Sequence, residues 1–411
     1  MNVKQLNSYS LGCFAFLLAA PPALASLGLG LFVIGSLYNY FRERPKIRWG
    51  LGWPYLILFG IYLVGSLYSP DQSYAFHILG KIMAFLIIPL CFLLNGALFS
   101  NKLRDSIRFF VLGVLFWNVV SIAIALFYYI DSKNFAVFTY YNLAEILHLH
   151  PTYQSLYILT ALVLLPIVQF HNTVLRAAIF LFLIIVLLLL EARIAVFIGI
   201  FIAAYNLVAL YKINKSVTFL TFAIILFGAV LFLNSSKRID DIHSSNYTNK
   251  VVGTINENGI NQRFWLWKNA WNQYLDKPIF GYGLGAQKSV FHYKVHKDLL
   301  FESYDHQYTI AAKKLSKLNL HNQYLQILFE FGLVGLVLFL CVIFYFLRIF
   351  YKKRMFLGIA IILIFCVVLL TENLIDRQMG IYYFIFFSSL FLFAEPLEPK
   401  CTETIIPTTK I

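Results

Sequence analysis

The sequence predicts an all-α fold, a polytopic membrane protein with about twelve spans and one large loop that itself contains helices. Of its 411 residues, 60% are hydrophobic and only 13% are charged, whereas a soluble domain is roughly half apolar and about a quarter charged. The mean hydropathy is +0.74. The apolar residues form long continuous runs, as membrane helices require. These observations exclude a soluble enzyme and a disordered protein.

The net charge of +14 is typical of Lys and Arg clusters that flank membrane helices on the cytoplasmic side. We therefore expect the lipid bilayer as a partner and no nucleic acid. The five cysteines show no metal-ligand spacing and none lies in the large hydrophilic loop, so they indicate neither a metal site nor a disulfide framework.

The N-terminus resembles a signal peptide, with Lys4, an apolar run and the small residues Ala23-Leu24-Ala25. A second apolar run follows at once and ends in the basic cluster Arg42–Arg48. This favours two retained helices that are broken at Pro21-Pro22.

Hydropathy divides the chain into four parts. We predict an N-terminal transmembrane bundle of about nine spans at 1–234, a periplasmic loop domain at 235–322, three spans within 323–394 and a cytoplasmic tail at 395–411. The predicted spans lie at roughly 9–22, 25–41, 50–68, 80–98, 109–130, 154–170, 177–191, 194–211, 217–234, 323–350, 355–371 and 381–394.

Basic residues between these spans fall on one side of the membrane. The positive-inside rule makes that side cytoplasmic and places both termini there. The large loop is then periplasmic. The residues are Arg42–Arg48, Lys102, Arg104, Arg108, Arg176, Lys212, Lys215, Arg348 and Lys352–Arg354.

The large loop opens with a polar stretch that contains Asp240, Asp241 and His243. Two acids beside a histidine are compatible with a metal site, but no second ligand pair has the required spacing, so we expect a solvated linker and no metal. A helix with Arg263 near its start comes next. Its aromatic face, which includes Trp267, is expected to lie at the membrane surface or to pack on the bundle.

A glycine-rich segment follows Pro278, with glycines at 281, 283 and 285. It lacks the strand–turn–helix context of a dinucleotide fingerprint, and we expect no nucleotide. Gly281 and Gly283 are instead predicted to form a turn that lets the backbone approach a ligand closely.

His321 and Asn322 stand at the end of the loop, at the mouth of the next span. A lone histidine is usually structural, but this one can act as a base near neutral pH. Glu330 follows within the first turns of that span.

Two further polar clusters are predicted near the outer surface. Glu191 and Arg193 lie between two apolar runs, and the connection between these runs is too short to leave the membrane. The two charged residues are therefore expected to pair with each other or to face a cavity. The turn Thr371–Gln378 carries Glu372 and Arg377, which are candidates for a structural ion pair.

His148 and His150 precede Pro151. They could be metal ligands, but a proline there favours interfacial residues at a helix start.

Taken together, these residues resemble the O-antigen ligase and O-antigen polymerase superfamily of bacterial membrane glycosyltransferases. The topology is similar over nearly the whole chain. The stretch around Arg193 resembles the family's Ser-Arg-Gly/Ala motif, although Ala192 replaces the serine. Arg263-x-x-x-Trp267 with the glycine turn resembles the loop helix, and His321-Asn322 followed by Gly332-x-x-Gly335 matches the motif at the end of the loop.

The resemblance implies a glycan donor on undecaprenyl diphosphate, at the periplasmic face of the bacterial inner membrane. In the ligase reaction the glycan passes to a sugar hydroxyl of lipid A–core with inversion, without cofactor, metal or nucleotide. His321 would be the general base. Arg193, Arg263 and Arg377 would bind the diphosphate, because arginine binds it in a bidentate manner. Asn322, Gly281, Gly283 and Trp267 would support the site.

Three alternatives stay open. A polymerase would join two lipid-linked repeat units, and a protein O-oligosaccharyltransferase would use a protein acceptor. A transporter of the lipid-linked glycan would instead place charged residues along a path through the membrane and show repeat symmetry.

Overall fold

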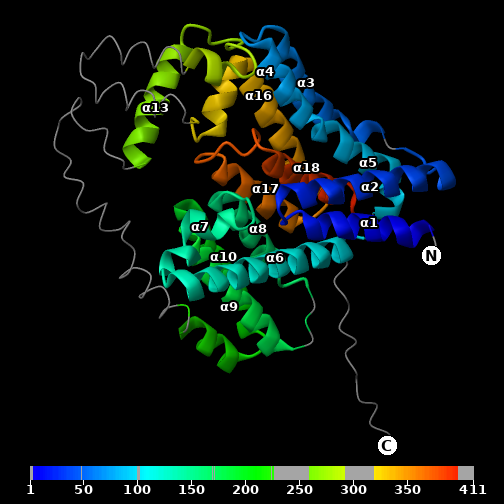
Figure 1. Cartoon of the computed structure of the whole chain (residues 1–411). Helices are drawn as coiled ribbons and strands as arrows, with labels where there is room; N and C mark the ends of the chain where they lie inside the picture. The colour runs from blue at the N-terminus through cyan, green and yellow to red at the C-terminus, as the bar shows by residue number, and fades with distance from the viewer. Residues whose placement is uncertain are drawn as a thin grey trace, which may run out of the picture.

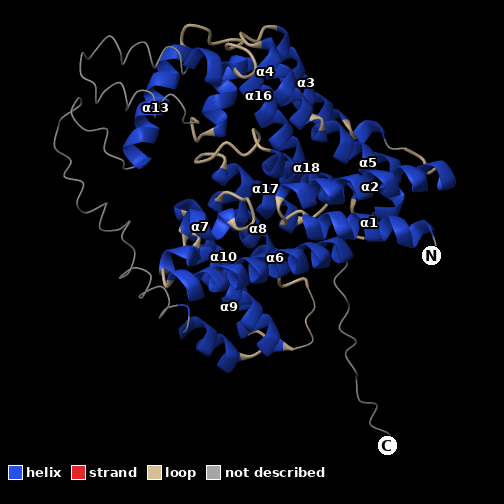
Figure 2. Cartoon of the chain, in the orientation of Figure 1, coloured by secondary structure: helices blue, strands red, loops and turns tan. Residues whose placement is uncertain are grey.

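The computed structural model describes residues 3–47, 49–99, 102–168, 170, 172–223, 225, 259–291 and 319–396. These residues form helices and connecting turns, and no strand occurs among them (Figure 2). The predicted all-α class is therefore confirmed. The α-helices are α1 Val3–Leu17, α2 Pro22–Glu43, α3 Trp53–Leu67, α4 Gln72–Ile82, α5 Ala84–Phe99, α6 Leu103–Ser132, α7 Tyr140–Glu145, α8 Pro151–Leu164, α9 Thr173–Leu189, α10 Arg193–Tyr211, α13 Gly259–Tyr274, α16 Gln323–Lys352, α17 Phe356–Val368 and α18 Gln378–Phe393.

Three short elements join these helices. They are the 3-10 turns η1 at Trp49–Leu51 and η2 at Phe135–Phe138, and the π-helical turn η3 at Gln287–Phe291.

Helix length supports a membrane-spanning bundle. In the described part of the chain, five apolar stretches are long enough to cross a bilayer, and shorter apolar helices such as α3, α9, α17 and α18 have 10–17 residues. A perpendicular crossing takes about 20 residues. The number of twelve spans thus stays a prediction. The five stretches are Pro22–Glu43, Gln72–Gly96, Leu103–Ser132, Arg193–Tyr211 and Gln323–Lys352.

The structure refines several predicted spans. The span predicted at 80–98 begins earlier, as α4, which is divided from α5 at Met83. The second half of the span at 217–234 lies outside the described residues. So do 235–258, with Asp240, Asp241 and His243, and 292–318, so the boundaries of the loop domain stay a prediction.

Helix α18 is the centre of the bundle (Figure 1). Every residue from Met379 to Phe393 is buried, because this helix is apolar on all sides. Phe384 stacks on Phe365 of α17 with ring centroids 4.8 Å apart, and α5 packs along another side. The buried helix gives the turn before it, residues 369–377, a fixed anchor.

Helix α16 is interrupted at Gly332. The backbone there has φ +67° and ψ −167°, a conformation open essentially to glycine alone. In a continuous helix the amides of Leu333 and Val334 would donate to the carbonyls of Phe329 and Glu330. The break removes these two hydrogen bonds and leaves four backbone groups without helical partners.

The glycine-rich segment replaces both lost hydrogen bonds. The amides of Tyr282 and Gly283 donate to the carbonyls of Phe329 and Glu330, at 3.0 and 2.8 Å. In return, Leu333 donates to the Pro278 carbonyl at 2.8 Å. Val334 likewise donates to the Ile279 carbonyl at 3.2 Å. Inside a bilayer each unpaired backbone group would cost several kcal/mol, so the segment makes the interrupted helix possible.

The glycines of this segment permit close contact between backbones. Gly281 and Gly283 have φ of +68° and +96°. A Cβ on Gly281 would lie 2.6 Å from the Glu330 carbonyl carbon, and one on Gly283 would lie 2.8 Å from the Cα of Ser69. The predicted close approach of the backbone therefore exists. In the structure it is an approach to α16 and to the end of α3, whereas the sequence analysis expected an approach to a ligand.

Candidate active site

The predicted base His321 lies just before α16. Asn322 caps this helix, and its side chain accepts a hydrogen bond from the Leu325 amide at 3.0 Å. His321 has φ +49°, in the left-handed region that few residues other than glycine occupy. The chain thus turns sharply at His321, and its side chain meets the turn 369–377.

His321 pairs with Glu372. Its Nδ1 lies 3.3 Å from the carboxylate Oε2 of Glu372. The side chain of Glu372 is only 4% exposed, whereas that of His321 is 23% exposed. An ionised carboxylate only accepts hydrogen bonds, so Nδ1 donates, and in the neutral imidazole Nε2 then carries the lone pair. The imidazole is therefore held on one side and accessible on the other.

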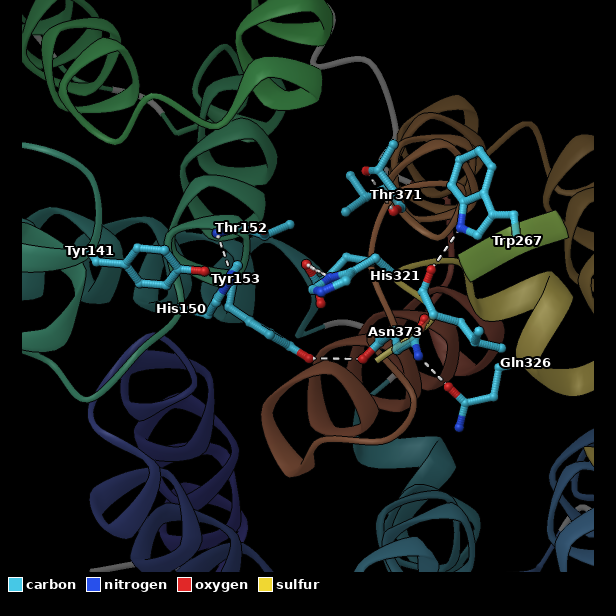
Figure 3. A network of polar contacts seen from close by, with 12 residues as sticks. Tyr141, His150, Thr152, Tyr153, Trp267, His321, Gln326, Thr371 and Asn373 are labelled. Carbon is cyan, nitrogen blue, oxygen red and sulfur yellow. Dashed lines mark hydrogen bonds and ion pairs between the residues drawn. The ribbon is translucent and has the colours of Figure 1, made fainter. Parts of the chain in front are cut away.

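The turn that carries Glu372 is tied to α16 and α8. Gln323 accepts a hydrogen bond from the Ile375 amide at 2.9 Å, and the Asn373 side chain donates to the side chain of Gln326. The hydroxyl of Tyr153 donates to the Asn373 carbonyl at 3.2 Å. Figure 3 shows this network around His321. The position of Glu372 is thus fixed from two sides.

Positive charge surrounds the His321–Glu372 pair. Burial by itself would raise the pKa of Glu372, but the hydrogen bond and charge of His321 lower it, and the charges of His150 and Arg263 lower it further. The net direction is downward, below the ordinary value of 4.5. Glu372 is therefore an anion at neutral pH.

His150 lies on the other side of His321 from Trp267 (Figure 3). Burial lowers the pKa of His150; the charges of Arg377, His321 and Arg263 act in the same direction, and that of Glu372 opposes them. The ring bonds locally, because its Nδ1 accepts from the Thr152 amide at 3.3 Å at the start of α8. Burial thus favours the neutral form of His150, which stands at the start of a helix, as the proline predicted. His148 is exposed beside Glu145.

Helix α13 places Arg263 and Trp267 near this pair. Leu266 and Ala270 are buried against α16, while Phe264 is 63% exposed. The indole nitrogen of Trp267 donates to the carbonyl of Leu320 at 2.7 Å, next to His321. The helix therefore packs on the bundle by one face and exposes Phe264 on another; a location at the membrane surface stays a prediction.

Of the three predicted arginines, Arg263 and Arg377 act on His150, whereas Arg193 lies at the start of α10. The charges of Arg263 and Arg377 both act on His150, and Arg377 is exposed just before α18. Arg193 is exposed at the first residue of α10, after a tight turn in which Glu191 has φ +48°. Among the described residues, the structure shows no hydrogen bond or ion pair between Arg193 and the His321 cluster.

Sequence reasoning missed the partner of His321. It considered Glu372 as a partner of Arg377, whereas the structure pairs it with His321. The two residues are 51 positions apart, and no local pattern links them. The one available signal was a carboxylate and a histidine predicted on the same side of the membrane. No cluster of three metal-ligating side chains occurs in the described part of the chain.

Comparison with known proteins adds a family to this geometry. A model of the O-antigen ligase family matches residues 178–340. A protein of Rickettsia conorii, named as a candidate polysaccharide ligase, is 28% identical over 292 residues, which cover 71% of this chain and 64% of that protein. A protein of Rickettsia typhi with the same description is 30% identical over 164 residues, 39% of this chain and 37% of that protein.

The resemblance to the O-antigen ligase superfamily is thereby confirmed. The matched stretch leaves about a third of the first relative, and more of the second, without a counterpart in this chain. The O-antigen ligase model begins within α9 and ends within α16. It thus includes Arg193, Arg263 and His321 but neither Glu372 nor Arg377. The comparisons support a membrane protein of the O-antigen ligase or polymerase type.

Proposed function

We propose that this protein is a membrane glycosyltransferase that moves a glycan from undecaprenyl diphosphate to a sugar hydroxyl of lipid A–core. The observation that carries the proposal is the His321–Glu372 pair beside Arg263 and Arg377. A half-buried imidazole held by a carboxylate is suited to general-base catalysis. Neighbouring guanidinium groups are suited to a diphosphate.

The proposed reaction needs only groups of this chain. Nε2 of His321 takes the proton of the acceptor hydroxyl while the hydroxyl oxygen bonds to the anomeric carbon. The bond from that carbon to the diphosphate oxygen breaks, and its electron pair leaves with the polyprenyl diphosphate. The imidazolium then returns its proton to water. Glu372 is a positioning residue, because it keeps Nδ1 protonated and stabilises the imidazolium.

The arginines would bind the donor. The charges of Arg263 and Arg377 act on His150, and that of Arg263 also acts on Glu372, while Arg193 would reach the diphosphate from α10. They would stabilise the negative charge that develops on the leaving group. Trp267 and Asn322 line an open apolar groove between α13 and α16, with Trp271 and Leu328. This groove is suited to the polyprenyl chain.

The distribution of charge supports the proposed orientation. Helix α16 begins directly after His321 and ends in the basic residues Lys352–Arg354, and α10 ends at the basic residue Lys212. A cytoplasmic location of these basic ends would put the site at the periplasmic face of the inner membrane.

A reconstituted transfer assay tests the proposal. Purified protein in nanodiscs receives a synthetic undecaprenyl-diphosphate glycan, with lipid A–core, with a protein acceptor or with neither, in chelator and without nucleotide. Product on lipid A–core supports the ligase. Longer lipid-linked chains without it mean the polymerase, and product on protein means the oligosaccharyltransferase. No transfer by folded protein under any condition contradicts the enzyme and favours the transporter.

A further inference from the structure

Besides the apolar groove, a polar cavity lies next to the His321 cluster, and it has no part in the mechanism above. Its volume is about 310 Å³, at the lower end of the roughly 300–1,000 Å³ of small-molecule sites. It is thus the size of a small ligand. Its polar walls come from α4, η3, α16 and the turns beside them, and include Tyr74, Gln287, Asn319, Gln326, Glu330 and Asp376.

The cavity is built for hydroxyl groups. Its walls offer carboxyl groups, amides and a phenol, which together can donate and accept hydrogen bonds. Lys81 and Lys288 also line it and balance the formal charges of Glu330 and Asp376. The two carboxyl groups disfavour an anionic ligand such as a diphosphate, and the polar walls disfavour an apolar ligand such as a polyprenyl chain. A neutral ligand that is rich in hydroxyl groups is compatible with both features of the cavity.

One buried donor in the wall has no hydrogen-bond partner among the residues that the structure describes. Gln287 is only 5% exposed, and its side-chain Nε2 has no hydrogen-bond partner among the described residues. A buried donor left unpaired costs free energy, so native proteins rarely keep one without a reason. Glu330 is already engaged, because Gly285 donates its amide to Oε1 at 3.2 Å. A ligand hydroxyl would complete the hydrogen bonding of Gln287.

The cavity is within reach of the proposed base. Asn319 precedes His321 by two residues, so their Cα atoms are at most about 7.6 Å apart. Asp376 belongs to the turn that holds Glu372. In Figure 3, Gln326 and His150 lie on opposite sides of the His321 ring.

Inversion requires the attacking hydroxyl and the leaving group to lie on opposite faces of the anomeric carbon. Because the charges of Arg263 and Arg377 act on His150, we assign the leaving diphosphate to the neighbourhood of His150 and the acceptor to the cavity. We propose that the cavity binds a sugar ring of the acceptor, next to the hydroxyl that is glycosylated. This inference rests on the proposed function, since it names a subsite for its acceptor.

The sharpest variant is Gln287→Met, which keeps the length of the side chain and removes the unpaired donor. A purely structural role predicts unchanged or improved thermal stability and unchanged kinetics. The subsite predicts a fivefold to tenfold rise in the KM for the acceptor, about the loss of one hydrogen bond, with an unchanged KM for the donor. The matched control is Gln273→Met, because Gln273 is also buried with an unpaired side-chain oxygen but lies outside the cavity.

The kinetic outcomes each decide the matter. An acceptor KM that rises in Gln287→Met and not in Gln273→Met supports the subsite. An unchanged acceptor KM overturns it while the transfer activity stands. A rise in the donor KM alone overturns it too, because the cavity would then hold a donor sugar.

A binding measurement separates failure of the inference from failure of the proposed function. Saturation-transfer NMR records methyl hexosides, as simple sugar rings, with the full-length protein in nanodiscs. Signals that fall at least fivefold in Gln287→Met and persist in Gln273→Met support a sugar site even if no transfer is detected. Equal signals in both variants, or none in the wild type, overturn the sugar site even if transfer is detected.

Discussion

The two halves of α16 differ in burial and in the polarity of their side chains. From Gln323 to Phe331 most side chains are buried, and Gln323, Gln326 and Glu330 are buried with polar partners. After Gly332 only one stripe is buried, while residues such as Phe344 are exposed and apolar. The first half thus positions a polar site and the second is suited to contact with lipid. The break at Gly332 lets one helix do both.

The largest expected effect lies just before the first half. His321→Asn keeps a residue that tolerates the left-handed backbone but removes the imidazole. We expect glycan transfer to fall by roughly 10²–10⁴-fold, the usual contribution of a general base, and the melting temperature to fall as well, because the buried Glu372 carboxylate loses its partner. The measurement is the initial rate in the nanodisc assay. Transfer within threefold of wild type would exclude His321 as the base.

The break itself is tested by Gly332→Ala. A Cβ there would meet the backbone of Ile279 and Phe280, and the conformation suits glycine alone, so we expect a loss of about 3 kcal/mol or failure to fold. The control is Gly60→Ala in α3, where a Cβ meets nothing within 4 Å and the helix should gain up to about 1 kcal/mol. Thermal unfolding in detergent measures both. Equal melting temperatures would mean that the break is not required.

The variant Glu372→Gln tests the role of the buried carboxylate beside the polar first half of α16. The pKa of Glu372 is lowered in the folded protein, so its ionisation stabilises the fold above its ordinary value of 4.5, and this stabilisation is lost as the pH falls through the folded value. We expect the variant to lack this part of the acid-induced loss of stability, and its kcat to fall about tenfold or more at unchanged donor KM.

The matched control is Glu145→Gln, since Glu145 stands 3.7 Å from His148 in an exposed pair. It should change neither kcat nor the acid limb of the melting curve. If both variants behaved alike, the buried pair would have no special role.

The smallest effect concerns the apolar second half. Phe346→Leu removes a fully buried ring and should cost about 1 kcal/mol, whereas Phe344→Leu, on the exposed face, should stay within about 0.5 kcal/mol. Both variants should keep full transfer activity. A larger loss from Phe344→Leu would show that protein, and not lipid, covers this face.

The sequence predicts most of the helices because their signal is local. The apolar runs at 50–68 and 109–130 correspond to α3 and α6, since hydropathy is summed over adjacent residues. The division between α4 and α5 at Met83 was not predicted, because the residues on both sides of it are apolar. The break at Gly332 depends on a segment far away in the chain, so its motif was visible while its cause was not.

The same reasoning applies to the candidate site. The predicted topology places His321, Arg263 and Arg377 on one side of the membrane, and in the structure all three residues act electrostatically on His150. The pairing of His321 with Glu372 depends on the turn between α17 and α18. That turn is set by tertiary contacts of Gln323, which no pattern in its own segment reveals.

The exchange of hydrogen bonds at Gly332 also bears on biosynthesis. The segment from Pro278 to Gly283 leaves the ribosome before α16 does, so the groups that complete the helix exist before the helix is made. Chains fold from the N-terminus as they are synthesised, and an interrupted helix that entered hydrocarbon alone would carry four unpaired groups. The order of the two segments in the gene therefore suits the order of their assembly, and a circular permutant that reverses it should insert poorly.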